Sequence, residues 1–133
     1  MDPPNKEGVH PARLLVVDDA MSSRLIVKRI LERLGYDVTL ASTGDEAVAL
    51  ATAGPFDAII MDVEMSGMDG LTATRLIREH DSRVPILAFT GNDKLEDART
   101  CRRAGMTGML RKPADPRQFE QMIAVVVAAR RSG

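Results

Sequence analysis

The sequence has little of several residue types, and each scarcity excludes a class of protein. One cysteine among 133 residues allows neither an intramolecular disulfide nor a four-cysteine zinc site. No run of about 18 apolar residues occurs, so we expect no membrane-spanning helix. The N-terminus also lacks the apolar stretch of a signal peptide. These features predict a protein without a membrane role that works in a reducing, cytoplasmic setting.

Aromatic residues are scarce as well, at 3% of the chain, and neither sign of charge dominates. Eighteen Lys and Arg against 19 Asp and Glu give a net charge of -1. A general nucleic-acid binder needs a basic surface, commonly with aromatic platforms for the bases. We therefore expect no direct nucleic-acid partner, and we interpret the arginines at 99, 102, 103, 130 and 131 as a solvated face.

What the chain does contain is the composition of one globular domain, with 44% apolar and 28% charged residues. Residues 1–12 are rich in proline and charge and predict a flexible tail. From residue 13 to 131, short apolar runs alternate with segments of helical periodicity, and residues 132–133 form the C-terminal end. We expect strands at 14–17, 38–40, 58–61, 86–89 and 109–110. We expect helices around 26–34, at 47–54, 70–80 and 93–104, and from about 115.

Five such units, with apolar strands buried on both sides, predict an α/β fold in which helices cover both faces of a parallel sheet. Periodicity alone does not give the order of the strands. Five units in this length fit a doubly wound, flavodoxin-like (βα)5 domain, for which we expect a five-stranded parallel sheet in the order 2-1-3-4-5. Ligands of such sheets bind beyond the carboxyl ends of the strands.

Polar residues follow or end four of the predicted strands. Asp18 and Asp19 terminate the first, Asp62 the third, Thr90 the fourth and Lys112 the fifth. Because the carboxyl ends of parallel strands share one edge of the sheet, we expect these five side chains to converge.

Three carboxylates at one edge repel each other unless a cation compensates their charge. Oxygen ligands without histidine or cysteine favour a hard ion, and Mg²⁺ fits best because it binds a few carboxylates and completes its octahedron with water and phosphate oxygens. Lys112 adds a mobile positive charge suited to a phosphoryl oxygen. Asp62, flanked by the cation and Lys112, is then a natural nucleophile for phosphoryl acceptance.

Four motifs in order carry a family resemblance. They read LLVVDD at 14–19, IIMDVEMSGMDG at 59–70, ILAFTG at 86–91 and LRKP at 110–113. Together they resemble the receiver domain of two-component response regulators, over about residues 12–131. The resemblance implies that Asp62 is the phosphoacceptor and that Thr90 and Lys112 contact the phosphoryl group. It further implies a cis peptide bond between Lys112 and Pro113.

The same resemblance implies a metal shell and partners. Asp19 and Asp62 would bind Mg²⁺ directly, Asp18 through water, and Glu64 through its main-chain carbonyl. The donor would be a sensor histidine kinase or a histidine phosphotransfer protein. We expect a stand-alone response regulator, a monomer or weak phosphorylation-dependent dimer, that catalyses its own phosphorylation and dephosphorylation without being a turnover enzyme. Its output would be onward phosphotransfer or docking of a protein on the fourth helix, fifth strand and fifth helix.

Three positions depart from the family pattern. Met109 stands where an aromatic residue is common, which puts the usual switch readout in question. Ser66 replaces a common proline, and Gly91 replaces a frequent alanine and should leave the site more open. Glu64 and Asn92 occupy positions that tune hydrolysis of the acyl phosphate in the family. Two alternatives to the response regulator stay open. The first is a phosphorylation-independent interaction module, and the other is a phosphatase with an aspartyl nucleophile.

Some conspicuous residues have plainer interpretations. Asp69 is expected to cap the third helix. Cys101 is expected to be a small core residue rather than a catalytic thiol. Val125 and the neighbouring alanines at 128 and 129 are expected to form an exposed apolar strip on the last helix.

Overall fold

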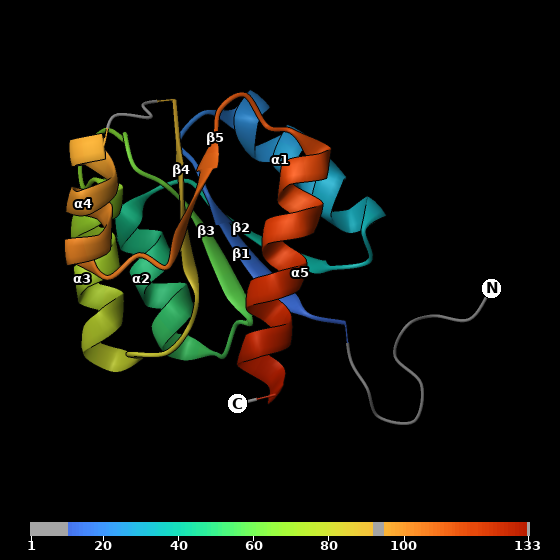
Figure 1. The fold of residues 1–133 in the computed structure, drawn as a ribbon. Coiled ribbons are helices and arrows are strands. Elements are labelled where there is room, and N and C mark those ends of the chain that lie inside the picture. The colour runs from blue at the N-terminus through green and yellow to red at the C-terminus, as the bar shows by residue number, and fades with distance from the viewer. Residues whose placement is uncertain (1–10, 92–94, 133) are drawn as a thin grey trace.

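The protein forms a five-stranded parallel sheet covered by helices on both faces (Figure 1). The computed structural model describes residues 11–91 and 95–132, with the backbone alone at 95 and 96. The strands follow the order β2-β1-β3-β4-β5, and every neighbouring pair is parallel. This confirms the predicted fold class and strand order. The strands are β1 (Arg13–Val17), β2 (Asp37–Ala41), β3 (Ala58–Asp62), β4 (Ile86–Thr90) and β5 (Gly108–Arg111).

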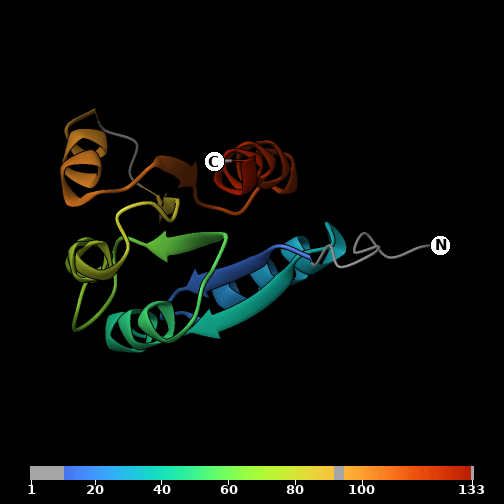
Figure 2. The ribbon, with the colours of Figure 1, turned by 90° about the horizontal axis from the view of Figure 1, so that it is seen from below.

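Five helices connect or follow these strands. In Figure 1, α1 and α5 lie on one side of the sheet, whereas α2, α3 and α4 lie on the other, and the view in Figure 2 shows the same two layers. The helices are α1 (Met21–Arg33), α2 (Gly44–Ala53), α3 (Gly70–His80), α4 (Leu95–Ala104) and α5 (Pro116–Ser132). In the part of the chain that the structure covers, no helix combines the length and the apolar character that crossing a bilayer requires.

The core is divided by the sheet, because successive strand residues point to opposite faces. Alternate residues of β1 illustrate this: Leu14 and Val16 pack toward α1 and α5, whereas Leu15 and Val17 pack toward α2 and α3. Phe89 and Phe119 meet edge to face on the first side, with ring centroids 5.5 Å apart. Both faces of the sheet are therefore apolar, and polar groups gather at its ends.

Side-chain caps mark the starts of α2 and α3, and a glycine follows the end of α1. The carboxylate of Asp69 accepts a hydrogen bond from the Thr72 N–H at 2.8 Å and caps α3, as predicted. Thr43 caps α2 in the same way, through the N–H of Glu46. Gly35, which follows α1, has φ of 96°, a conformation that glycine adopts without steric cost. The Asp69 cap closes the loop that follows Asp62.

The predicted boundaries differ from the observed ones at several ends. α1 begins at Met21, ahead of its periodic apolar residues, and β5 extends by one residue on each side of its apolar pair. Ala12, which the expected tail includes, is buried, and its carbonyl accepts the Asp37 N–H at 2.9 Å. Residues 1–10 of that tail lie outside the described residues. Cys101 is buried, as expected for a core residue.

Candidate functional site

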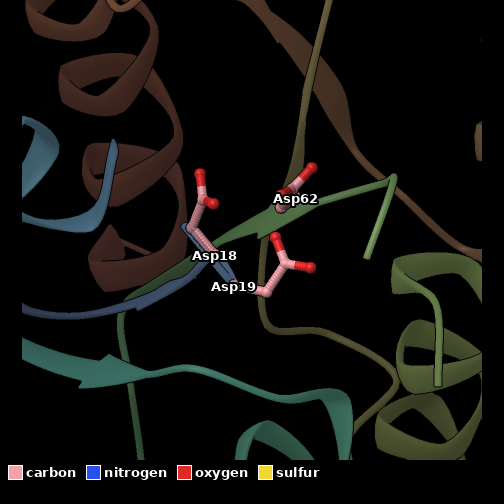
Figure 3. Close-up of side chains that lie close together, drawn as sticks. All are labelled: Asp18, Asp19 and Asp62. Carbon is pink, nitrogen blue, oxygen red and sulfur yellow. The ribbon is translucent and has the colours of Figure 1, made fainter. Parts of the chain in front are cut away.

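Three carboxylates meet at the carboxyl ends of β1 and β3 (Figure 3). Asp62 is the last residue of β3, and the register that pairs Val17 with Met61 places Asp18 beside it. Oxygen atoms of Asp18, Asp19 and Asp62 all lie within 4.8 Å of one another. Asp18 and Asp62 are buried, at 0% and 1% exposure, whereas Asp19 is exposed. The predicted convergence of these three side chains is therefore observed.

Lys112 brings a positive charge into the same cluster. Its Nζ lies 3.1 Å from Oδ1 of Asp62 and 3.8 Å from Oδ2 of Asp18. The backbone holds it there, because the Lys112 N–H donates to the Thr90 carbonyl at 2.9 Å. The Lys112–Pro113 peptide bond is cis, as the sequence motif implied.

The charge balance of the cluster remains negative despite the lysine. Burial raises the pKa of Asp62, and the Asp18 charge raises it further. Lys112 and the Glu64 N–H, which donates to Oδ1 at 3.1 Å, act in the opposite direction. The net result is a pKa of about 6 for Asp62. A cation between the carboxylates would relieve this strain.

The two other aspartates are held by nearby donors. Oδ1 of Asp18 accepts the Ala20 N–H at 2.9 Å, and Oδ2 accepts the hydroxyl of Ser23. Oδ2 of Asp19 accepts the Ser66 N–H at 3.0 Å. Proline at position 66 would have no N–H to give. The departure at Ser66 thus provides a link between Asp19 and the loop after β3, which sequence reasoning did not foresee.

Thr90 and Glu64 contact each other at the rim of the cluster. Thr90 is 3% exposed at the end of β4, and its hydroxyl donates to Oε2 of Glu64 at 3.3 Å. The Glu64 side chain itself is exposed. The role expected for its main-chain carbonyl, as a metal ligand, stays a prediction.

Gly70 is a residue near the site whose importance the sequence pattern does not indicate. A Cβ at this position would lie 2.2 Å from the carbonyl oxygen of Asp62 and 3.0 Å from Cγ of Met61. The first turn of α3 therefore approaches the backbone of Asp62 more closely than any side chain permits. In the sequence it is simply a glycine directly after the helix cap Asp69.

The three expected switch and tuning residues have different environments. Met109 is half-buried in β5, beside a cavity of about 60 Å³ that Cys101 and Met106 also line. Gly91 is exposed, and a Cβ there would meet no atom within 4 Å. Asn92 lies outside the described residues.

The donor set of the cluster fits a small, hard divalent cation. Asp18, Asp19 and Asp62 provide carboxylate oxygens without nitrogen or sulfur ligands, and this is the chemistry that Mg²⁺ prefers. The exposure of Asp19 leaves room for the water ligands that Mg²⁺ retains. These three residues would hold the ion, next to the Lys112 ammonium.

Comparison with known proteins gives a consistent family relationship. A family model described as "Response regulator receiver domain" matches residues 14–124. Among curated proteins, the CAI-1 autoinducer sensor kinase/phosphatase CqsS of Vibrio cholerae serotype O1 is 37% identical over 115 residues, which are 84% of this chain and 17% of CqsS. The chain spans between 13% and 19% of the length of four such curated relatives.

Solved structures agree with this relationship. The receiver domain of the sensor histidine kinase PA1611 from Pseudomonas aeruginosa PAO1 has a TM-score of 0.83 and 34% identity, and covers 89% of this chain and 98% of its own. That structure has a magnesium ion coordinated in its active site cleft. The chemotaxis protein CheY4 of Vibrio cholerae has a TM-score of 0.83 at 35% identity, over 87% of this chain and 98% of its own.

Proposed function

The chain belongs to the response regulator receiver domain family, and from this premise we propose that Asp62 accepts a phosphoryl group from a phosphohistidine donor. The observation that carries the proposal is the position of Asp62, buried within reach of two other carboxylates and 3.1 Å from the Lys112 ammonium. Receiver domains are generally phosphoacceptors rather than turnover enzymes. We propose that this chain likewise catalyses only its own phosphorylation and dephosphorylation.

The side chains would divide the chemistry as follows. A carboxylate oxygen of Asp62 forms a bond to phosphorus while the bond from phosphorus to the donor's imidazole nitrogen breaks, and the nitrogen leaves with the electron pair. Lys112 Nζ, mobile on its long side chain, stabilises a phosphoryl oxygen. Bound Mg²⁺, held by Asp18, Asp19, Asp62 and the proposed Glu64 carbonyl, would neutralise charge on the phosphoryl oxygens.

Thr90 has to exchange partners for its proposed role. Its hydroxyl donates to Glu64 in this structure, and it would donate to a phosphoryl oxygen once Asp62 is modified. This exchange frees the Glu64 carboxylate at the rim of the site. Glu64 would then influence how water approaches the acyl phosphate, together with the Gly91 and Asn92 positions.

Mass spectrometry tests the proposal directly. Incubation with a small phosphodonor such as acetyl phosphate and Mg²⁺ should add the mass of one phosphoryl group to the wild-type chain. Asp62→Asn should abolish the adduct, and chelation of Mg²⁺ should do so too. Asp37→Asn, at an exposed aspartate on β2, is the matched control and should keep the adduct. An adduct that persists in Asp62→Asn would contradict the assignment.

A phosphorylation-independent interaction module is the second candidate. Met109 favours it, because a thioether offers neither the ring edge nor the hydroxyl of the residue common in the family. Beryllofluoride, a phosphoryl analogue, separates the two by amide NMR. Shifts in α4 and β5 on binding with Mg²⁺ would support a phosphorylation-driven switch. Binding without such shifts would support the module.

The partners follow from the same proposal. A histidine kinase or histidine phosphotransfer protein would supply the phosphoryl group in the cytoplasm. A downstream protein would dock on α4, β5 and α5, where Val125 is 67% exposed and the alanines at 128 and 129 are exposed as predicted. Residues 13–131 would make up the receiver domain.

A further inference from the structure

Asp18 is the most buried carboxylate of the cluster, at 0% exposure, and the start of α1 holds it on three sides. The Ala20 N–H donates to Oδ1 at 2.9 Å, and the Ser23 hydroxyl donates to Oδ2. The Arg24 guanidinium donates to the main-chain carbonyl of Asp18 at 2.8 Å. Both carboxylate oxygens of Asp18 therefore have donors, and its side chain has one preferred orientation.

The oxygen that Ser23 contacts also faces Lys112. Lys112 Nζ lies 3.8 Å from Oδ2 of Asp18 but 3.1 Å from Oδ1 of Asp62. A buried carboxylate oxygen without a donor is costly and would attract the nearest cation. The Ser23 hydroxyl satisfies Oδ2 of Asp18, and the ammonium lies closer to Asp62 than to Asp18.

We propose that Ser23 is a positioning residue that acts through Asp18. Its hydroxyl keeps the Asp18 carboxylate directed at the cation site and leaves Lys112 available to Asp62. The proposal rests on the function proposed above, because it concerns the cation and the lysine that serve Asp62. Without the Ser23 hydroxyl, the Asp18 carboxylate would rotate, or its unsatisfied oxygen would attract Lys112 away from Asp62. Either change weakens cation binding.

Substitutions at two adjacent serines of α1 test this proposal. Ser22 is exposed and, like Ser23, lines a cavity of about 420 Å³ that Lys112 also borders. Ser22→Ala therefore gives the same change in helix propensity without removing a contact to Asp18. Isothermal titration calorimetry of the unphosphorylated full chain should show Mg²⁺ affinity about 10-fold weaker in Ser23→Ala, the loss typical when a group that orients a ligand is removed. Ser22→Ala should match wild type, and Ser23→Thr, which keeps a hydroxyl, should restore most of the affinity.

A second background shows whether Ser23 acts through Asp18. In Asp18→Asn, adding Ser23→Ala should cause little further loss of Mg²⁺ affinity, because the two residues form one unit. The rate of phosphorylation by acetyl phosphate at saturating Mg²⁺ should also fall in Ser23→Ala and not in Ser22→Ala. This fall would reflect the displacement of Lys112.

Several outcomes would overturn the proposal. Equal Mg²⁺ affinity in Ser23→Ala and Ser22→Ala is one, and equal losses in Ser23→Ala and Ser23→Thr are another, since shape rather than the hydroxyl would then matter. A wild-type chain that binds no Mg²⁺ would overturn it too. A wild-type chain that binds Mg²⁺ but gains no phosphoryl adduct would refute the proposed function alone, because the affinity comparison still tests Ser23.

Discussion

The buried negative charge of Asp62 destabilises the folded protein, and a substitution that removes the charge should relieve this effect. Burial next to Asp18 disfavours its charged form, as the raised pKa of about 6 indicates. In the metal-free protein at neutral pH, the charged Asp62 carboxylate is therefore unfavourable, and interactions elsewhere in the fold offset its free energy. The buried charge of Asp62 therefore lowers the stability of the metal-free protein.

We therefore expect Asp62→Asn to stabilise the metal-free protein. Removal of one charge from the crowded cluster should raise the free energy of unfolding by about 1–2 kcal/mol and the Tm by about 5 °C. Thermal unfolding in EDTA, followed by circular dichroism, measures this change. Mg²⁺ should then raise the Tm of wild type far more than that of the variant. An unchanged Tm in EDTA would mean that the three carboxylates repel each other less than their separation indicates.

Sequence reasoning located Asp18, Asp19, Asp62 and Lys112 because strand ends of a parallel sheet share an edge. It did not find Ser23 as a partner of Asp18. That contact depends on how α1 is rotated relative to β1, and periodicity does not specify the rotation closely enough to pair two side chains. The sequence pattern showed Ser66 only as the absence of a proline. Its N–H matters because it donates a hydrogen bond to Asp19, and this contact is visible only in the structure.

At the scale of elements, the contact between α3 and β3 is set by Gly70. The helix starts directly against the backbone of Asp62, and its cap residue Asp69 fixes the starting point. Any shift of this helix would move Asp62 with it. The close approach therefore connects helix packing to the geometry of the site.

Gly70→Ala should disturb both stability and the site. Its Cβ would overlap the Asp62 carbonyl, so we expect a loss of about 1–3 kcal/mol, as for overpacked cores, together with weaker Mg²⁺ binding. Gly91→Ala is the matched control, because its Cβ would have free space, and its stability should stay within about 0.5 kcal/mol of wild type or rise slightly. Urea denaturation of both variants makes the comparison. Equal stabilities would show that α3 shifts at no cost.

The predicted strands were the apolar centres of the observed ones. Most of the additional strand residues are polar or lack a side chain, as at Asp37 and Gly108, and they join the sheet through backbone hydrogen bonds that hydropathy does not register. The start of α1 at Met21 was missed for a related reason. Ala20 gives no side-chain cap, so the sequence offers no conventional start signal there.

At the scale of the whole molecule, Asp81 connects parts that are distant from the acidic cluster. It follows the last residue of α3 and precedes β4, and its Oδ1 accepts the N–H groups of Arg83 and Val84 at 2.8 and 3.0 Å. Its Oδ2 lies 3.5 Å from Nη2 of Arg130 on α5. Burial alone would raise the pKa of Asp81, but these backbone hydrogen bonds and the charges of Arg130 and Arg78 lower it below its ordinary value.

A group with a lowered folded pKa stabilises the protein above its unfolded pKa, about 4 for Asp, and this stabilisation is lost as pH falls through the folded pKa. Asp81→Asn keeps an acceptor but loses the charge, so it should lower the free energy of unfolding by about 1 kcal/mol at pH 7. The difference from wild type should shrink below about pH 4. Chemical denaturation at several pH values measures the difference in free energy of unfolding between wild type and Asp81→Asn. Asp37→Asn, at an exposed position, is the control. A difference that persists unchanged at acidic pH would mean that charge is not its source.

The strand order gives the two charged partners of the site unequal freedom. Asp62 lies on β3, which is bonded to β1 and β4, whereas Lys112 follows β5, an edge strand bonded to β4 alone. Opening the edge breaks one ladder of hydrogen bonds, and opening the centre breaks two. Local opening of the sheet should therefore displace Lys112 more readily than Asp62, because Lys112 follows the edge strand and Asp62 lies on an inner strand. Hydrogen exchange of the β5 amides should accordingly be faster than that of the β3 amides.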